Sequence, residues 1–343
     1  MAKFKKASDI KVGVIGYGPA FGMGPAHLNQ MRDAGMTPAV VSDLDPARLE
    51  VAKKDFPGIQ TFTSVSEMLK KSDVNLVVII TPHNTHAKLA LQCLKAGRHV
   101  VCEKPFAITT AECDAMIAEA KKRKLVVSAY HNRHWDGWIM QAVKVIKQGK
   151  IGDVVRVEAH MGRYGCPGNW WRTSKTISGG IMYDWGAHLL EYSLQVINSE
   201  IREVTGFAKN GVWAAKTAWK KDTNEDEAQA VVRFASGQWL SLCMTAIDCN
   251  PKRGMLEITG TKGTYIMGGE EWEIITPTEN GQQIEKGKNP PAEYWRFYKN
   301  IADHLVKGEP LVITGEWARR PIHIIDLACQ SAKKGLSLKA KYG

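Results

Sequence analysis

Asp184 and His188, four residues apart, have the side-chain types and spacing best suited to acid–base chemistry in this sequence. In a helix, residues i and i+4 lie on one face, so both side chains would face one ligand. Histidine titrates near neutral pH and suits proton transfer. The preceding Ser178-Gly179-Gly180 permits close approach of a ligand. The plain alternative is a helical hydrogen-bonded pair with no catalytic role, and the pair alone favours that alternative.

Lys104, in the sequence Glu103-Lys104-Pro105, adds a third candidate group directly after an apolar run. An ammonium group can hydrogen-bond a reacting oxygen and stabilise negative charge that develops on it. Oxidation of a secondary alcohol needs such a group, because a hydride leaves carbon while a base removes the hydroxyl proton. We therefore predict a catalytic trio in which His188 is the general base, Lys104 holds the reacting oxygen, and Asp184 orients the substrate and tunes the histidine.

A glycine-rich turn follows the first strand pattern, KVGVIG. Glycines at this place let backbone amides approach a pyrophosphate, and the next helix N-terminus favours its negative charge. The spacing here is GxGxxxG, with Phe21 where the third glycine usually stands. The loop residues predicted to bind a cofactor are Gly16, Tyr17, Gly18, Pro19, Ala20 and Phe21.

Asp43 ends the second strand pattern, 25 residues beyond Gly18 (43 − 18). An acid there accepts hydrogen bonds from the adenosine ribose and repels an added 2′-phosphate. NAD is therefore expected in preference to NADP, although Arg48 lies close enough in sequence to keep NADP open.

Polar residues also follow the later strand patterns, and ligands of an open parallel sheet bind at the carboxyl ends of its strands. The further residues predicted to bind the cofactor are Thr81, His83, Asn84, His86, Glu103, Lys104, Asn132 and Arg172. Two HxxH strings, 83–86 and 131–134, have no third ligand at metal-site spacing, so no metal is expected.

The segment Gly168-Asn169-Trp170-Trp171-Arg172 is interpreted as a substrate loop. Aromatic faces suit the CH faces of sugar rings, and arginine can bind hydroxyls, a carboxylate or a phosphate. The residues predicted to bind substrate are Arg163, Tyr164, Trp170, Trp171 and Arg172, together with the catalytic trio. The alternative for adjacent tryptophans is a place in the core or in an interface.

Two different residue patterns in the sequence predict the strands and helices that position these residues. Up to residue 130, short β-branched runs alternate with helical stretches, which indicates βαβ units and a doubly wound parallel sheet. Asp45 with Pro46 opens a helix, and Gly97 ends one. After residue 150 the pattern becomes two-residue alternation with tight turns such as Asn280-Gly281, which indicates an antiparallel sheet.

The predicted fold class is therefore α/β plus α+β, with an N-terminal Rossmann domain and a C-terminal open antiparallel sheet. We assign residues 1–130 to the NAD-binding domain and 131–310 to a substrate and oligomerisation domain, and expect the tail 311–343 to pack back on the first domain. A homo-oligomer, dimer or tetramer, is expected through the antiparallel sheet of residues 151–290, because its breadth together with four tryptophans exceeds what one sheet face must bury against the first domain. They are Trp213, Trp219, Trp239 and Trp272.

Composition excludes several classes of partner. The net charge is 46 − 35 = +11, but no run of five or more like charges occurs, so a solvated surface is favoured over nucleic-acid binding. No segment approaches the roughly 20 apolar residues of a membrane helix, and the N-terminus lacks a signal-peptide pattern. The seven cysteines never form CxxC, which favours reduced, buried thiols of a cytoplasmic protein.

The chain resembles the Gfo/Idh/MocA oxidoreductases over essentially its whole length. Three segments carry this resemblance: EKP at 103–105, TPHNTH at 81–86 and GGIMYDWGAHLLE at 179–191. This family includes glucose–fructose oxidoreductases and inositol dehydrogenases. The resemblance implies hydride transfer between NAD(P) and a polyhydroxylated ring, and an open sheet often used for oligomerisation. It also implies that Lys104 meets nicotinamide and substrate, with Asp184 and His188 on the substrate side.

The chain departs from the family pattern at three places: the longer glycine loop, Tyr183 in place of a small aliphatic residue, and Glu191 where aspartate is more common. The predicted function is an NAD-dependent oxidoreductase of carbohydrate metabolism acting on a secondary hydroxyl of a sugar, inositol or glycoside. Redox-neutral glycoside cleavage or epimerisation through a transient keto-sugar, with tightly bound NAD, uses the same residues and stays open. A non-enzymatic NAD-sensing module is disfavoured because the trio is intact.

Overall fold

The computed structural model describes residues 3–342, which divide into two compact units. One unit holds the chain up to Asn132 together with Trp295–Arg319, and the other holds Arg133–Tyr294 together with the residues from Arg320 onward. The predicted tail, 311–343, is thus divided between the units at Arg319 rather than kept as one segment.

The first unit is built on a six-stranded sheet in the order β3-β2-β1-β4-β5-β6, with every neighbouring pair parallel. Its strands are β1 (Lys11–Ile15), β2 (Thr37–Ser42), β3 (Gln60–Phe62), β4 (Leu76–Ile79), β5 (His99–Cys102) and β6 (Val127–Ala129). All residues of β4 and β5 are buried, as expected of a sheet covered on both faces. The strand order reverses beside β1, where doubly wound folds bind dinucleotides. The predicted Rossmann sheet is confirmed.

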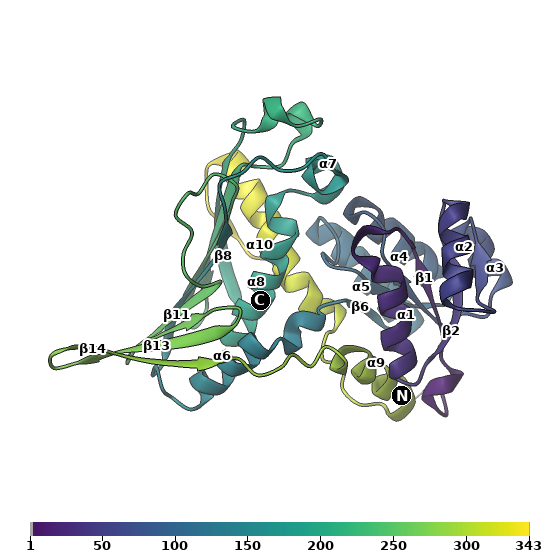
Figure 1. Ribbon diagram of the computed structural model, residues 1–343, viewed down its shortest axis with the longest axis horizontal. Helices are drawn as coiled ribbons and strands as arrows, with labels where there is room; N and C mark the ends of the chain where they lie inside the picture. The colour runs from purple at the N-terminus through teal and green to yellow at the C-terminus, as the bar shows by residue number, and fades with distance from the viewer. Residues whose placement is uncertain (1–2, 343) are drawn as a thin grey trace. The chain divides into compact units, whose positions relative to one another are not determined.

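The helices that connect successive strands of this unit run from purple to blue in Figure 1. They are α1 (Met23–Asp33), α2 (Pro46–Asp55), α3 (Val65–Lys71), α4 (His86–Lys95) and α5 (Thr110–Arg123), with α9 (Arg296–Lys307) added from the later chain. The Asp45 carboxylate accepts a hydrogen bond from the Ala47 N–H at 2.9 Å, and Pro46 is the first residue of α2. Gly97 follows α4 with φ +80°. Both predicted helix boundaries are confirmed.

The second unit contains a nine-stranded sheet in the order β14-β13-β12-β11-β7-β10-β9-β8-β15. Its strands are β7 (Val154–Gly162), β8 (Ile201–Lys209), β9 (Glu227–Phe234), β10 (Trp239–Thr245), β11 (Leu256–Gly260), β12 (Thr264–Met267), β13 (Glu271–Thr278), β14 (Gly281–Lys288) and β15 (Leu338–Lys339). The sheet is antiparallel except between β7 and β10, which run parallel. Thr278 pairs with Gly281, so the tight turn is Glu279-Asn280, one residue earlier than predicted.

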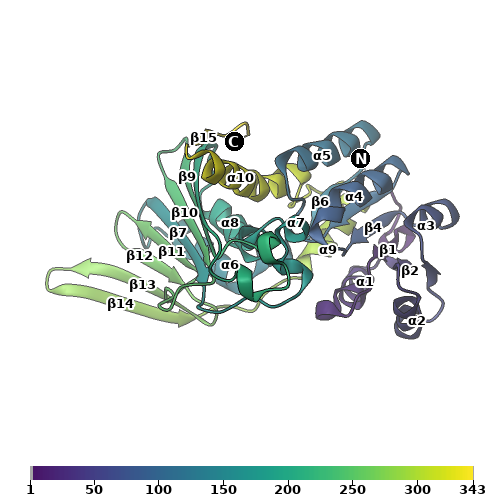
Figure 2. The same cartoon turned by 90° about the horizontal axis from the view of Figure 1, so that it is seen from above.

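Helices cover one face of this sheet, as Figures 1 and 2 show for α6 (Gly137–Lys147), α8 (Trp185–Val196) and α10 (Gly315–Lys334). Along β10, Leu240 and Leu242 are fully buried and alternate with the more exposed Trp239 and Ser241. The strand therefore has one face toward the helices and one face that no helix of its unit covers.

The structure contradicts the argument from the four tryptophans. Trp213 and Trp219 lie in the loop that follows β8, not on the sheet. Trp272 is buried and stacks on Tyr265, with ring centroids 6.2 Å apart. Only Trp239 alternates with the helix-facing residues of its strand, so tryptophan content does not predict an oligomeric interface here.

Two further expectations concern cysteines and membranes. The cysteines of the described chain are free, but Cys166 and Cys249 are exposed rather than buried. Within residues 3–342, we find no helix with the length and apolar character needed to cross a membrane.

Candidate functional site

The glycine loop after β1 leads through a short helix, η2 (Ala20–Gly22), into α1. Gly16 has φ +99°, and a Cβ there would lie 3.0 Å from the Ile80 carbonyl oxygen, so this position requires glycine. Gly18 and Gly22 have open space where a side chain would stand. Phe21 adopts φ +61° and is exposed. The loop is thus an open cradle at a helix N-terminus, which fits a pyrophosphate.

Tyr17 faces the protein interior rather than this cradle. Its hydroxyl donates to the Asp55 carboxylate at 2.8 Å, and its ring lies so close to Gly24 that a Cβ there would be 2.5 Å from Cδ2. Burial and Asp55 raise the pKa of Tyr17. We therefore assign its side chain to loop anchoring and propose no cofactor contact for it. Gly24 lies outside the glycine-loop spacing, so this spacing gave no signal for it.

Asp43 lies beside the loop. One carboxylate oxygen accepts from the Tyr17 N–H at 2.6 Å, and the other accepts from the Asp45 N–H at 2.9 Å. Arg48 is directed to Asp45, with Nε 3.6 Å from its carboxylate. Two backbone hydrogen bonds thus hold the carboxylate of Asp43 in place directly after β2.

His86 joins the loop after β4 to the loop after β5. Its ring is fully buried, with Nδ1 2.9 Å from the Pro105 carbonyl oxygen and Nε2 2.8 Å from that of Thr81. Burial lowers the pKa of His86. This histidine therefore stabilises the two loops, and we propose no cofactor contact for it. In contrast, Asn84 is exposed at the end of the β4 loop.

Glu103 and Lys104 follow β5. The Glu103 carboxylate accepts from His27 Nε2 at 3.0 Å and from the Lys104 N–H at 2.9 Å, while His27 Nδ1 lies 2.6 Å from the Tyr298 hydroxyl. Burial raises the pKa of Glu103, but the hydrogen bond from His27 and the charges of His27 and Lys104 outweigh it, and the pKa stays below its ordinary value. The ionised carboxylate thus orients the backbone of Lys104. Sequence patterns gave no signal for His27 or Tyr298 in this role.

In the second unit, Asp184 and His188 lie at the start of α8. The prediction placed both residues within one helix, and the structure differs. Asp184 precedes the helix with φ −85° and ψ −91°, so only His188 lies within it. His188 is buried, and its ring contacts that of Trp185 edge-on with centroids 5.4 Å apart. The half-buried Asp184 accepts a hydrogen bond from Arg172 Nη1 at 2.9 Å.

Arg172 connects the predicted substrate loop to this aspartate. Its guanidinium carbon lies 5.2 Å from the ring centroids of both Trp170 and Trp171. Trp170 is 40% exposed, so part of its ring is available to a ligand. Cation–π contacts and the ion pair therefore bring Trp170, Trp171, Arg172 and Asp184 together. Tyr164 is also exposed and packs against Trp213, with centroids 5.4 Å apart.

Glu191, one turn beyond His188, is buried and faces His134. The distance from Glu191 Oε1 to His134 Nδ1 is 2.6 Å, and its other oxygen accepts from Gln195 at 3.0 Å. The HxxH string 131–134 thus supplies a partner for this carboxylate. Within residues 3–342, no group of three or more His, Cys, Asp or Glu side chains is arranged to hold a metal ion.

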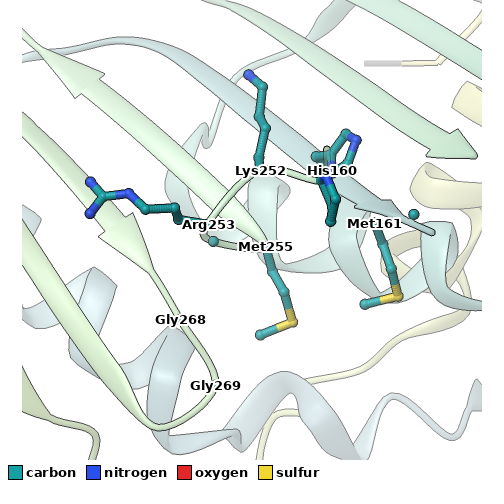
Figure 3. Close-up of a pocket in the computed structure, with 10 residues that line it drawn as sticks. His160, Met161, Lys252, Arg253, Met255, Gly268 and Gly269 are labelled. Atoms are coloured by element: carbon teal, nitrogen blue, oxygen red, sulfur yellow. The ribbon is translucent and has the colours of Figure 1, made fainter. Parts of the chain in front are cut away.

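A separate cavity of about 170 Å³ lies at the end of β7, lined by His160, Lys252 and Arg253 (Figure 3). Lys252 pairs with Glu158 at 3.0 Å, and Arg253 pairs with Glu273 at 3.3 Å. Because these carboxylates neutralise both Lys252 and Arg253, the lining of the cavity does not favour the binding of an anion. None of the predicted catalytic residues lines it.

The parallel sheet, the open glycine loop and the acid after β2 define a dinucleotide-binding oxidoreductase. Two family models match the chain: "Oxidoreductase family, NAD-binding Rossmann fold" over residues 10–131, and "GFO/IDH/MocA C-terminal domain" over residues 139–266. The chain belongs to the GFO/IDH/MocA oxidoreductases, a class of dehydrogenases acting on CH–OH groups.

Individual relatives agree with this assignment. The scyllo-inositol 2-dehydrogenase (NADP(+)) IolW of Bacillus subtilis is 25% identical over 96% of both chains. An uncharacterized oxidoreductase of Schizosaccharomyces pombe, C115.03, is 34% identical over 77% of this chain and 73% of its own. A solved levoglucosan dehydrogenase, in complex with NADH and levoglucosan, superposes with a TM-score of 0.82 at 20% identity, covering 97% of this chain and 99% of its own.

Proposed function

We propose that the protein is an NAD-dependent dehydrogenase that oxidises a secondary hydroxyl of a sugar, inositol or glycoside. The cluster of Trp170, Arg172 and Asp184 beside the helix of His188 carries this proposal. It combines a partly exposed aromatic face, hydrogen-bonding polar groups and a candidate base, which are the groups that a polyhydroxylated ring needs. The named substrates of the inositol and levoglucosan dehydrogenases among the similar proteins support the same class.

The first unit offers the residues that would hold the dinucleotide. The backbone of Gly16 through Phe21 would receive the pyrophosphate, and Asp43 the adenosine ribose. We propose Thr81, His83, Asn84, Glu103 and Asn132 for the remaining contacts. The bound dinucleotide would supply the hydride acceptor. Asp43 favours NAD, while the Bacillus relative is named for NADP, so this preference needs its own test.

In the proposed reaction, His188 accepts the proton of the substrate hydroxyl. The Lys104 ammonium donates a hydrogen bond to the same oxygen and stabilises the charge that develops on it. Asp184, oriented by Arg172, accepts hydrogen bonds from substrate hydroxyls, and the exposed ring of Trp170 packs against the CH face of the sugar. Lys104 belongs to the first unit and His188 to the second.

An absorbance screen for NADH tests this function. Protein freed of bound cofactor would be mixed with NAD and with a panel of inositols, anhydrosugars, free sugars and glycosides. We expect at least one polyol to give NADH in stoichiometric amount. A panel member that is consumed without release of NADH, by protein reloaded with NAD, would contradict net oxidation and indicate the redox-neutral reaction, which no structural observation favours.

A further inference from the structure

Five consecutive polar residues, Asp222–Asp226, form a segment directly before β9 that the sequence analysis did not single out. We call it the 222–226 segment. Its first residue binds the start of the short helix α7 (Lys175–Ser178). The Asp222 carboxylate accepts from the Ser174 hydroxyl, from Thr176 Oγ1 at 2.6 Å and from the Thr176 N–H at 3.0 Å. The start of α7 is thereby tied to this segment.

Asn224 forms hydrogen bonds to both ends of the segment that runs from Arg172 to Ser178. Its Nδ2 donates to the Arg172 carbonyl oxygen at 2.7 Å, and its backbone N–H donates to that of Thr173 at 2.9 Å. Its Oδ1 accepts from the Ser178 hydroxyl at 3.0 Å. Ser178 in turn accepts from the Gly180 N–H at 3.3 Å, at the turn that precedes Asp184. An amide suits this place because it donates and accepts at once.

Glu225 holds the backbone segment that precedes Asp184. One carboxylate oxygen accepts from the Ile181 N–H at 3.0 Å, and the other pairs with Lys175. A Cβ on Gly180 would lie 2.7 Å from Glu225 Oε2, so glycine is required there. The 222–226 segment therefore fixes the backbone on both sides of the 2.9 Å Arg172–Asp184 ion pair.

We propose that Asn224 is a positioning residue for substrate recognition. It holds the Arg172 carbonyl and the Ser178 turn at a set separation, so that the Arg172 guanidinium meets Asp184 while contacting the rings of Trp170 and Trp171. The substrate part of this inference rests on the proposed function. The reasoning is geometric: a misplaced Arg172 backbone would move both the aromatic face and the carboxylate that the sugar contacts.

The matched control is Asp226, in the same segment. Its carboxylate accepts from the Val212 N–H at 2.8 Å and the Trp213 N–H at 3.0 Å, in the loop after β8. Asn224→Ala removes both side-chain contacts, and Asn224→Asp removes the donor alone. We expect both variants to raise the KM for the polyol about tenfold and to leave the KM for NAD within about twofold. Asp226→Asn should leave both KM values within about twofold, even if it lowers the melting temperature.

Backbone hydrogen exchange gives a readout that does not depend on activity. In Asn224→Ala, amides of residues 172–181 should exchange faster than in the unmodified protein, whereas Asp226→Asn should leave them unchanged. Unchanged exchange in both Asn224 variants, an unchanged polyol KM, or an equal KM increase in Asp226→Asn would overturn the inference. If the unmodified protein oxidises no polyol, the proposed function fails, and the exchange result still decides whether Asn224 positions this segment.

Discussion

At the residue scale, Asp43 should decide between NAD and NADP. Both of its oxygens already accept backbone hydrogen bonds, so the carboxylate cannot turn away from an added 2′-phosphate. We expect NAD to bind about tenfold or more tightly than NADP, and Asp43→Ser to reduce this ratio. Fluorescence titration measures both affinities. Glu50→Gln, which removes an exposed acid of α2, is the control and should leave the ratio unchanged. Equal affinities in the unmodified protein would refute this assignment.

The proposed base gives a second prediction at this scale. His188→Ala should lower turnover by about 10²–10⁴, the usual size of a general acid–base contribution. It should change NAD affinity little, because the glycine loop belongs to the other unit. Since Ala leaves a gap at this buried position, His188→Gln serves as the variant of closer volume.

The pH profile checks the same prediction independently of the size of the loss. The unmodified enzyme should gain oxidation rate as a group near neutrality deprotonates, and both histidine variants should lose that limb. Lys104→Ala should lower turnover and also weaken cofactor binding. Full activity with the limb intact in His188→Ala would place the base elsewhere, with Tyr183 or Lys104 as the next candidate.

Local sequence patterns predicted the strands whose burial depends on residues that are neighbours in the sequence. Apolar runs before residue 130 indicated strands buried on both faces, such as β4, and alternation after residue 150 indicated strands buried on one face, such as β10, because burial depends on neighbouring residues. The parallel pairing of β7 with β10 was missed, since their approach joins segments about 80 residues apart. The site shows the same limit. Asp184 and Arg172 could be predicted, but the hold of Asn224 on Arg172 joins residues 52 apart through backbone carbonyls, which leave no pattern.

The first residue of β5 gives a prediction for stability. His99 is buried, and its Nδ1 accepts from the Val126 N–H at 2.9 Å. Burial, and then the charges of Lys3 and His304, lower its pKa to about 3. Below an unfolded pKa of about 6.5, the unfolded chain binds a proton that the folded state refuses. The contribution of neutral His99 to the free energy of unfolding is therefore complete above pH 6.5, and it is lost progressively as the pH falls toward 3.

Urea unfolding at pH 7 and pH 5 measures this effect. The free energy of unfolding should fall by about 2 kcal/mol more in the unmodified protein than in His99→Asn between these pH values. The variant is less stable at pH 7 because it disturbs a buried site, but only the pH dependence decides the prediction. Identical pH dependence in the two proteins would show that folding does not lower the pKa of His99.

The nine-stranded sheet has a second face, opposite α6, α8 and α10, which no helix in the described part of its unit covers (Figures 1 and 2). The strand register places Ile284, Ile275, Arg156 and Trp239 in one row across this face. Ile284 is 52% exposed and Trp239 is 37% exposed, so the row presents apolar surface at two separate strands. A large exposed face of mixed apolar and charged residues is typical of association between copies.

We therefore predict a homo-oligomer, a dimer or a tetramer, formed through this face, on different grounds from the tryptophan count. Light scattering at micromolar concentration should give a multiple of 38.0 kDa. Trp239→Glu combined with Ile284→Glu should shift the mass toward the monomer, because each change buries a carboxylate in the interface without a partner. Leu44→Glu changes a residue that is 88% exposed in the first unit, and should leave the mass unchanged. A monomeric mass of the unmodified protein would contradict the prediction. An oligomer that survives the double substitution would place the interface on another surface.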